Sequence, residues 1–447
     1  MKVSLNKSAV KGTVRVPSSK SMTIRALMCA ALSRGTSEVV HPLVSEDTGA
    51  AAEVLGKIGV SVQKENDLWR VTGGSLRASA GELYCGESAT TMRFMIAICT
   101  LIPGTHTLVG GPSLTKRPVK SLVEALHKLG IKYTLGGKTT PPVTIEGGTF
   151  KGGKTEIPGN VSSQFISALL LIAPFAEKET SITLTTPMTS TPYVLMTIWC
   201  LKKFGINIRH ELGKFIVRRQ RYVPTRIEID GDWSSASYFL ALGAVSAEGI
   251  TVENLSTSTL QGDRVILDHL RRIGADVKVA GNAITVSEGK LKAIHADLSD
   301  CIDLLPTVAV LAALADGKSE LSGIERARIK ESNRVAVIKE GLQKLGVTVT
   351  EDRDRLTIIG LKTPVKIEET KFEEAGQDKI GDVEEKTVEK GPVVINSYGD
   401  HRIAMAFSVF GAAEGNIIID GSECVAKTYP DFWEAFKSVG GEIEKNG

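Results

Sequence analysis

The sequence predicts an α/β fold of two pseudo-symmetric halves, each built from three repeated units. Two observations predict this fold. An amphipathic helix that ends in glycine and continues into an alternating strand occurs six times along the 447 residues. A second helix, apolar nearly all round and polar at its beginning, also occurs once in each unit. The composition, 42% hydrophobic and 23% charged, is that of a globular chain long enough for two cores.

The glycine-ended helices mark the period of the repeat. Each has cationic residues near its end, where they favour the helix dipole, and then a glycine suited to ending the helix. The unit is about 70 residues long, and the last copy follows a longer segment. The copies are LGKIGVSV (55–62), LHKLGIKY (126–133), LKKFGINI (201–208), LRRIGADV (270–277), LQKLGVTV (342–349) and FKSVGGEI (436–443).

The apolar helices are expected to form the middle of each half. Helices that are apolar nearly all round are buried, so three should lie side by side, wrapped by sheet and by the amphipathic helices. The segments that contain them, each followed by a turn and a strand, are 19–39, 87–108, 160–184, 232–252, 300–321 and 399–419.

A charged segment at about 362–392 explains the longer last spacing. Between Lys366 and Lys390 it has nine acidic and five basic residues and few large apolar ones. Such a composition does not bury a core, so we interpret the segment as a solvated insertion.

The beginnings of the buried helices predict an anion-binding cleft. Helix N-termini present unpaired N–H groups and partial positive charge. Parallel helices point the same way, so two halves facing each other bring these ends together. Lys20, Arg25, Arg93 and Arg402 lie within the first turns, where a cation opposes the dipole unless an anion is bound. The Ser, Thr and Asp residues there also serve as N-caps, which remains the alternative for each single helix.

Further cations flank the predicted cleft. Arg117 lies in PSLTKRPVKS, Lys330 and Arg334 surround Glu331 in RIKESNR, and Lys427 precedes YPDF. Each alone is typical of a solvated charge or surface ion pair. Glu331 is either part of a salt-bridge network or an acid beside phosphate-binding cations.

Two more polar residues lie at the beginnings of apolar helices. Asp303 is either a helix cap or a general base. His401 is either a buried, hydrogen-bonded histidine or a catalytic one.

Several classes of protein are disfavoured. The longest apolar run, Leu304–Ala315, is shorter than the roughly 18 residues of a membrane span, and the sequence MKVSLNKS is unlike a signal peptide. Six scattered cysteines without a CxxC pair argue against disulfides and zinc and favour the cytoplasm. A net charge of +3 and 5% aromatics argue against nucleic acid. P-loop, HExxH and GxSxG motifs are absent, which disfavours nucleotide triphosphatases, zinc hydrolases and α/β-hydrolases.

Over essentially its whole length the chain resembles the enolpyruvyl transferases, in particular those that act on shikimate 3-phosphate. The resemblance implies a two-domain inside-out α/β barrel with three βαβαββ-like units per domain and the active site between the domains. One domain would span 14–226 and the other 1–13 and 227–447. The motifs that carry the resemblance are SSKSMTIRA (18–26), ESATTMR (87–93), LTKRP (114–118), GNVSSQF (159–165), DWSSASYFLA (232–241), RIKESNR (328–334), YGDHRIAMA (398–406) and AKTYPDF (426–432).

The reaction that the resemblance implies belongs to aromatic amino acid (chorismate) biosynthesis. The enolpyruvyl group of phosphoenolpyruvate is transferred to the 5-hydroxyl of shikimate 3-phosphate by addition and elimination, and phosphate is released. Both substrates are anions, which matches the predicted cleft. The resemblance implies no cofactor, no metal and no membrane or nucleic-acid partner, and we expect a cytoplasmic monomer.

The resemblance also implies roles for individual residues. Asp303 would be the base toward the 5-hydroxyl, and Glu331 the proton donor to the methylene carbon, with Lys20 as a rival in the proton transfers. Phosphoenolpyruvate would be held by Lys20, Arg93, Arg117, Arg334, Arg402 and Lys427. Shikimate 3-phosphate would be held by Ser21, Arg25, Ser162, Ser163, Gln164, Ser190, Tyr193, Asp303 and Lys330.

The chain departs from the family's usual pattern at three places. Asn333 stands where the family usually has Asp, and Arg326 and its neighbours do not match the usual stretch before RIKESNR. Ala89 stands where Gly is frequent. We hypothesise that its methyl group projects toward the phosphoenolpyruvate pocket and crowds the longer inhibitor glyphosate more than the substrate.

Three other functions are compared with this one. UDP-N-acetylglucosamine enolpyruvyl transferases typically have Lys-Asn where Lys20-Ser21 stands and a reactive Cys near Arg117, and GPSLTKRP has no Cys. A non-catalytic anion-binding repeat protein would need the basic cleft but neither Asp303 nor Glu331. An RNA-end-processing enzyme built on similar units is disfavoured by the scarcity of aromatic residues.

Overall fold

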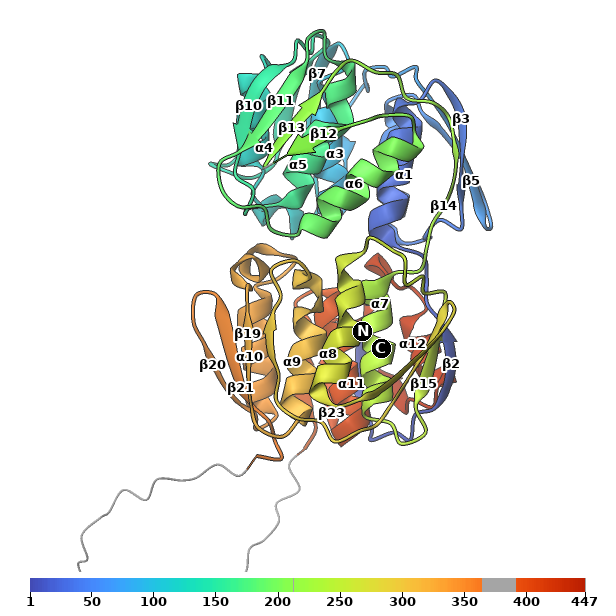
Figure 1. The fold of residues 1–447 in the computed structure, drawn as a ribbon, viewed down its shortest axis with the longest axis vertical. Helices are drawn as coiled ribbons and strands as arrows, with labels where there is room; N and C mark the ends of the chain where they lie inside the picture. The colour runs from blue at the N-terminus through green and yellow to red at the C-terminus, as the bar shows by residue number, and fades with distance from the viewer. Residues whose placement is uncertain (212, 364–390, 447) are drawn as a thin grey trace, which may run out of the picture.

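The chain folds into two lobes along its long axis (Figure 1). The computed structural model describes residues 1–211, 213–363 and 391–446, so the expected insertion at 362–392 lies almost wholly outside the described residues. Each lobe has its own hydrophobic core. One core draws its buried residues from Met22 to Ile229, and the other from Val3 to Val16 and from Trp233 to Ile443.

The six sheets share one topology. Each has four strands, and the spatial order is first, second, fourth and third strand of a βαβαββ unit. The first two strands are parallel, and the other pairs are antiparallel, as in the sheet of β10, β11, β13 and β12. The predicted α/β fold of six repeated units is confirmed.

The first lobe contains three units. They consist of α1 (Lys20–Leu32), β3 (Gly35–Val40), α2 (Glu46–Lys57), β4 (Ser61–Glu65) and β5 (Leu68–Gly73); β6 (Leu83–Tyr84), α3 (Ala89–Cys99), β7 (Gly104–Val109), α4 (Lys120–Lys128), β8 (Lys132–Leu135) and β9 (Val143–Gly147); and β10 (Gly153–Ile157), α5 (Ser163–Ile172), β11 (Thr180–Leu184), α6 (Thr191–Lys203), β12 (Arg209–Glu211) and β13 (Lys214–Val217).

The second lobe repeats the pattern. Its units consist of α7 (Trp233–Ala244), β15 (Ile250–Glu253), α8 (Ile266–Ile273), β16 (Asp276–Ala280) and β17 (Ala283–Ser287); β18 (His295–Asp297), α9 (Leu305–Leu314), β19 (Lys318–Ser322), α10 (Arg334–Lys344), β20 (Thr348–Glu351) and β21 (Arg355–Ile359); and β22 (Val393–Asn396), α11 (His401–Glu414), β23 (Ile417–Asp420), α12 (Phe432–Ser438), β24 (Ile443–Asn446) and β1 (Lys2–Leu5).

Two strands are exchanged between the lobes at the points where the chain crosses. The first unit takes β14 (Arg226–Glu228) as its first strand, and the fourth unit takes β2 (Gly12–Arg15). The expected domain limits at 14 and 226 remain predictions. Because β2 packs in the second lobe and β14 in the first, we propose that the crossings lie a few residues later, near 17 and 230.

The two crossings run side by side. Ser18 and Gly231 form an antiparallel bridge, Ser19 N–H donates to the Asp230 carbonyl at 2.8 Å, and Asp232 N–H donates to the Pro17 carbonyl at 2.8 Å. The lobes are therefore joined by a narrow two-stranded connection, the kind of element that a domain rotation can use as a hinge.

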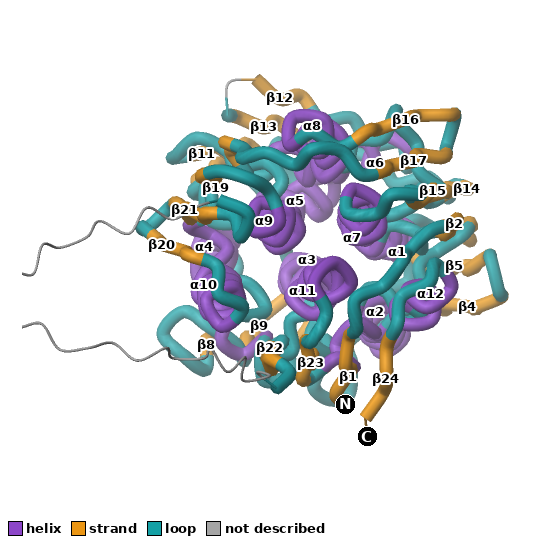
Figure 2. The backbone as a smooth tube through the Cα atoms, turned by 90° about the horizontal axis from the view of Figure 1, so that it is seen from below, coloured by secondary structure: helices purple, strands orange, loops and turns teal. Residues whose placement is uncertain are grey.

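The apolar helices lie in the middle of each lobe. Seen along the long axis, α7, α9 and α11 stand around the centre of the second lobe, and the sheets form its outside (Figure 2). Every described residue of α9 is buried. The six glycines that end the amphipathic helices all have positive φ, from 82° to 104°, as a helix-ending glycine requires. One strand begins later than expected, since β12 starts at Arg209 instead of directly after Gly205.

Two global features bear on the expected setting of the protein. Within the described ranges, no helix combines the length and the apolar character needed to cross a bilayer. All six cysteines fall in these ranges, and each is a buried free thiol.

Candidate active site

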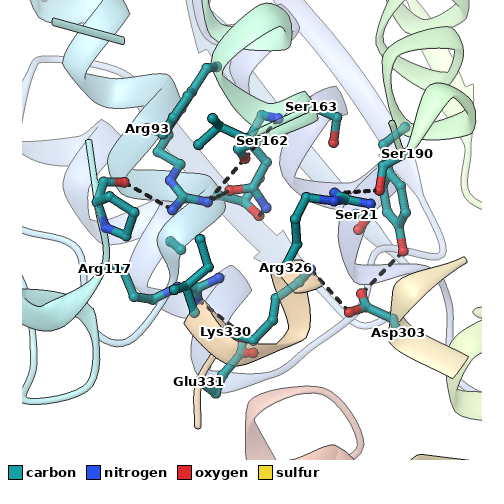
Figure 3. A pocket seen from close by; sticks show the side chains of 18 of the residues that line it. Ser21, Arg93, Arg117, Ser162, Ser163, Ser190, Asp303, Arg326, Lys330 and Glu331 are labelled. Carbon is teal, nitrogen blue, oxygen red and sulfur yellow. Dashed lines mark hydrogen bonds and ion pairs between the residues drawn. The ribbon is translucent and has the colours of Figure 1, made fainter. Parts of the chain in front are cut away.

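The beginnings of the buried helices meet in a pocket between the lobes (Figure 3). The first lobe contributes the N-terminal turns of α1, α3, α5 and α6. The second lobe contributes the residues before α9 and α10 and the first turn of α11. Six cationic and three acidic side chains line this pocket, which gives it a positive charge suited to anions. The sequence-predicted residues that line it are Lys20, Ser21, Ala89, Arg93, Arg117, Ser162, Ser163, Gln164, Ser190, Tyr193, Asp303, Lys330, Glu331 and Arg402.

Arg93 is fixed at the first-lobe wall by three acceptors. Its Nη1 donates to Gln164 Oε1 at 2.6 Å and to Ser162 Oγ at 3.4 Å, and its Nη2 donates to the Pro118 carbonyl at 3.2 Å. The guanidinium also lies over the ring of Phe165, 4.9 Å from its centroid. Burial and the neighbouring Arg117 lower the pKa of Arg93, so an anion bound here would relieve an unfavourable charge.

Asp303 is not a helix cap but the centre of an ion-pair cluster. Its carboxylate accepts from Arg334 Nη1 at 2.8 Å, Arg402 Nη2 at 3.1 Å and Lys330 Nζ at 3.3 Å, and Tyr193 donates to it at 3.2 Å. Burial alone would raise the pKa of Asp303, but Arg402, Lys330 and Arg334 together hold it well below its ordinary value. Asp303 is therefore ionised, as a proton acceptor must be.

Glu331 bridges the two lobes. Its carboxylate accepts from Arg334 Nη2 at 2.6 Å within the second lobe and from Arg117 Nη1 at 3.2 Å across the pocket. Burial would raise the pKa of Glu331, but Arg117 and Arg334 hold it well below the ordinary value. This ion pair ties the loop of Arg117 to the segment before α10.

Lys20 lies at the first turn of α1, where acidic partners offset its position at a helix N-terminus. Its Nζ donates to Asp47 Oδ2 at 2.9 Å, and its backbone N–H donates to Asp232 Oδ2 of the second lobe at 3.1 Å. Asp232 also caps α7 by accepting from Ser235 N–H at 2.8 Å. Asp232 therefore both caps α7 and contacts the backbone of a pocket residue. A polar residue at the beginning of a helix can thus serve as an N-cap and also help to form the pocket.

Three predicted residues lie outside the pocket lining. Arg25 is buried behind it and donates to Thr197 Oγ1 at 2.7 Å and to the Ser21 and Tyr193 carbonyls. Arg334 is 1% exposed and is saturated by carboxylates, including Asp400 at 2.8 Å. Lys427 lies at the surface of the second lobe, where its Nζ donates to the Gly399 carbonyl at 2.8 Å. Direct contact of these three with substrate remains a prediction; in this structure Arg25 and Arg334 position other pocket residues.

A family model described as EPSP synthase (3-phosphoshikimate 1-carboxyvinyltransferase) matches residues 5–436. The chain belongs to the EPSP synthase family. A 3-phosphoshikimate 1-carboxyvinyltransferase of Dehalococcoides mccartyi is 42% identical over 100% of both chains, and one of Methanocaldococcus jannaschii is 36% identical over 97% of both. The chain is thus an enzyme with EPSP synthase activity, a transferase of the shikimate pathway and of aromatic amino acid biosynthesis.

Solved structures agree with this assignment. The EPSP synthase of Acinetobacter baumannii is 28% identical, covers 100% of both chains and superposes with a TM-score of 0.77. The enolpyruvyl transferase NikO of Streptomyces tendae is 14% identical with a TM-score of 0.76 over 99% and 98% of the two chains, which supports the fold alone. The inside-out α/β fold expected from the resemblance is confirmed.

Three pocket residues of this EPSP synthase family member were not predicted from the sequence. Asp47 holds Lys20, Thr90 Oγ1 accepts from Gln164 Nε2 at 2.8 Å, and Arg326 reaches Ser190. Asp47 follows Glu46 in the first turn of α2, where acidic residues are common for helix stability alone. Arg326 could have been found from the sequence, because it departs from the family pattern directly before the pocket motif RIKESNR.

One expectation about a neighbouring residue is corrected, and one departure from the family pattern is explained. His401 is buried, but neither of its ring nitrogens has a hydrogen-bond partner among the described residues, so the hydrogen-bonded alternative is wrong. Burial, Arg402 and Lys20 lower its pKa well below the ordinary value, which keeps the imidazole neutral. Asn333 caps α10 by accepting from Ala336 N–H at 3.2 Å. Asn and Asp cap helices equally well, which accounts for this departure from the family pattern.

Proposed function

We propose that the pocket between the lobes transfers the enolpyruvyl group of phosphoenolpyruvate to the 5-hydroxyl of shikimate 3-phosphate. The observation that carries the proposal is the meeting of two carboxyls, Asp303 and Glu331, with basic side chains of both lobes in one pocket. Such a site combines proton transfer with charge stabilisation at a departing phosphate. Cations supplied by the chain can serve this purpose without a metal.

The two substrates are assigned to opposite ends of the pocket. Ser190 lies on the side of Asp303, and Ser162 and Ser163 line the first-lobe wall next to Arg93; these hydroxyls suit the phosphorylated ring. The other end, toward Arg117 and Glu331, suits phosphoenolpyruvate. The cations assigned to phosphoenolpyruvate are Lys20, Arg93, Arg117 and Arg402.

In the proposed addition, Asp303 takes the proton of the 5-hydroxyl as its oxygen attacks C2 of phosphoenolpyruvate. C3 receives a proton from Glu331, with Lys20 as the alternative donor. In the elimination, the C2–phosphate oxygen bond breaks and a C3 proton returns to Glu331, which restores the double bond. The proton held by Asp303 leaves with the phosphate. Closing the lobes about the crossings near Ser18 and Gly231 would exclude water from these steps.

Glu331 must gain a proton before it can donate one. In this structure the ion pairs with Arg117 and Arg334 keep it ionised. An anionic substrate that pairs with Arg117 would weaken this stabilisation and raise the pKa of Glu331, so binding would favour proton uptake. Substrate binding itself would prepare the acid.

The test replaces Glu331 by Gln, which keeps the shape but cannot transfer a proton. We expect substrate binding to be kept and turnover to fall by about two to four orders of magnitude. The measurement is phosphate release from phosphoenolpyruvate, with shikimate 3-phosphate and separately with UDP-N-acetylglucosamine as acceptor. Release with the second acceptor alone would reject the proposed substrate.

The matched control for this variant is Glu325→Gln. Glu325 lies in the same segment but is exposed and pairs with Arg353 outside the pocket. We expect its turnover to stay near that of the wild type. Unchanged turnover in Glu331→Gln would reject the proposed role of that carboxyl.

The oligomeric state and the cellular compartment of the enzyme are also part of the proposal. We propose a monomer in the cytoplasm, because each lobe contributes to one complete pocket within a single chain and all six thiols are buried and unpaired. Sedimentation equilibrium would measure the mass in solution, and a dimer would contradict the first part.

A further inference from the structure

The third repeated unit has far more positive charge after its amphipathic helix than the four other units with a stretch of equal length. Between Lys202 and Arg226 the sequence has eight Lys and Arg residues and one acidic residue, Glu211, which is a net charge of +7 in a chain of net charge +3. The equivalent stretches reach at most +3, so the excess is not a requirement of the repeated fold. The stretches compared are 56–80, 127–151, 271–295 and 343–367.

All eight of these cationic residues are exposed. Three of them form ion pairs, which join Arg209 to Glu211, Arg218 to Glu179 and Arg226 to Glu38. Within the residues that the structure describes, the other five form no ion pair, and they are Lys202, Lys203, Lys214, Arg219 and Arg221. Like charges held close together repel each other, so an anionic partner would stabilise this surface.

Backbone hydrogen bonds join three stretches of the first lobe into one surface. Gln220 N–H donates to the Pro174 carbonyl at 3.0 Å, and Val223 N–H donates to the Phe204 carbonyl at 3.0 Å. The stretch 218–223 is thereby held against the short 3₁₀ turn at 173–175 and against the end of α6. The unpaired cations of α6 and of 218–223 consequently share one side of the lobe.

Two exposed apolar side chains lie among these cations. Phe175 is 37% exposed and stacks on Tyr222 with the ring centroids 5.6 Å apart, and Val223 is 55% exposed. Glu177, two residues after Phe175, does not balance the cations around it. We define the basic face as Phe175, Lys202, Arg219, Arg221 and Val223.

The basic face is separate from the pocket between the lobes. Helix α6 begins at the pocket, which Ser190 and Tyr193 line, and it ends at Lys203. Its 13 residues place about 20 Å between these two ends, more than the roughly 8 Å over which salt screens exposed charges in the cell. No residue of the basic face lines the pocket. Attraction of substrates to the pocket therefore does not explain this charge.

We propose that the basic face binds an acidic segment of a partner protein, in which apolar side chains lie among the carboxylates. The carboxylates would pair with Lys202, Arg219 and Arg221, whose guanidinium groups can hold a carboxylate by two parallel hydrogen bonds. The apolar side chains would cover Phe175 and Val223. Arginine and aromatic side chains are enriched in protein interfaces, and complementary charge selects the partner. This inference is independent of the proposed function.

The basic face fits an acidic protein segment better than other polyanions. Single-stranded nucleic acid binds by stacking its bases on free aromatic rings, and one side of the Phe175 ring is already stacked on Tyr222. An anionic membrane favours an amphipathic helix with a broad apolar side, whereas this face consists of a helix end and two loops with two apolar side chains. The simplest alternative is a solvated charge that binds any polyanion equally.

The experiment uses two fluorescent peptides of equal length and charge, one of Glu-Glu-Leu repeats and one of Glu-Glu-Ser repeats. Fluorescence anisotropy measures their dissociation constants. We expect the leucine peptide to bind about ten-fold more tightly, because its leucines cover Phe175 and Val223. Replacing both residues together, by Phe175→Ser and Val223→Ser, should abolish this difference and leave the affinity for the serine peptide within about two-fold.

Arg219→Glu combined with Arg221→Glu tests the charges. We expect both peptides to bind at least about ten-fold more weakly to this variant. The matched control is Lys290→Glu combined with Lys292→Glu, which changes the net charge equally. Lys290 is exposed and lies sixteen residues after Gly274, as Arg221 lies sixteen residues after Gly205. Binding to the control should stay within about two-fold of the wild type.

Several results would overturn the inference. Equal affinity of the wild type for the two peptides, or an equal loss in the control, would show a charged surface without a specific partner. Tighter binding of a single-stranded oligonucleotide, or of phosphatidylglycerol vesicles, would assign the face to another class of partner. Turnover with shikimate 3-phosphate should be unchanged in every variant, and its absence in the wild type would instead contradict the proposed function. Thermal melting separates a loss of binding from a loss of folding.

Discussion

Single side chains in this site have their charge state set by the neighbours around them. Asp303 and Glu331 are both ionised despite burial, because Arg402, Lys330 and Arg334 surround Asp303, and Arg117 and Arg334, one from each lobe, surround Glu331. The sequence predicted Glu331 because it lies among basic residues in RIKESNR, and Asp303 because it is a polar residue at the beginning of an apolar helix. It could not predict Asp47 or Thr90, because their roles arise from contacts with side chains that are distant along the chain.

Asp263 shows the opposite balance of burial and charge. It is buried behind the pocket, where Ser234 donates to its Oδ2 and Tyr193, which shares its single hydroxyl proton between Asp263 and Asp303, lies 3.1 Å from the same oxygen. Burial and the nearby charge of Asp303 raise the pKa of Asp263 to about 6. Since this pKa lies above that of an unfolded Asp, ionisation of Asp263 destabilises the fold as pH rises through about 4 to 6.

We therefore predict that Asp263→Asn stabilises the protein at neutral pH. The ionised carboxyl costs up to about 3 kcal/mol there, whereas at pH near 4 both the folded and the unfolded forms hold much of the proton. The variant should gain melting temperature at about pH 8 and gain much less at about pH 4. Equal shifts at the two pH values would contradict the assignment of the effect to this carboxyl.

A second prediction at this scale concerns Ala89. It is the first residue of α3, it is 5% exposed, and it lines the pocket. Replacing it by Gly removes the methyl group, so we expect glyphosate to inhibit the variant more strongly than the wild type. The measurement compares inhibition constants for glyphosate, with KM for phosphoenolpyruvate as the control. Equal sensitivity of both proteins would reject the hypothesis.

Individual helices and strands were well predicted because their signals are local. Each of the six glycine-ended helices and each apolar helix occurs where its periodicity indicates. The exchange of β2 and β14 between lobes was not predictable in this way. Both strands have an ordinary local sequence, and only the pairing of β2 with β15 and of β14 with β3 reveals which lobe they complete.

Glycines in two helices allow a matched prediction, in which the same change from Gly to Ala is made at one exposed and one buried position. Gly56 in α2 is exposed, and a Cβ there would meet nothing within 4 Å. Gly341 in α10 is buried, and a Cβ there would lie 2.5 Å from the ring of Phe407 in α11. Gly56→Ala should raise the free energy of unfolding by about 1 kcal/mol through helix propensity.

Gly341→Ala should instead lower the free energy of unfolding by about 1 to 3 kcal/mol, because α10 and α11 must separate to accept the methyl group. Urea unfolding of both variants against the wild type measures the difference. A gain in stability for Gly341→Ala would show that the two helices approach less closely than in this structure.

At the scale of the whole molecule, the charge is concentrated where the lobes meet. The chain as a whole carries a net charge of +3, yet the lining of the pocket alone has six cationic and three acidic residues. The overall composition gave no sign of this, because it averages over both lobes. The cleft was nevertheless predictable from the repeat, since parallel helices must present their N-termini on one side of each lobe.

This concentration of charge predicts a dependence on ionic strength. Salt screens the attraction between the basic pocket and two anionic substrates, so KM for both should rise several-fold between roughly 0.05 and 0.5 M salt. The turnover number at saturation should change less, because the charges inside the closed pocket are shielded from solvent. Constant KM values, with an unchanged melting temperature, would contradict a steering role for the pocket.

The placement of β1 has a consequence for how the protein is made. Strand β1 lies between β23 and β24, so the sixth sheet unites strands that are translated far apart in time. On a ribosome, the first lobe has all of its strands once translation has passed β14. The nascent second lobe must wait, with β1 unpaired, until β23 and β24 have been translated.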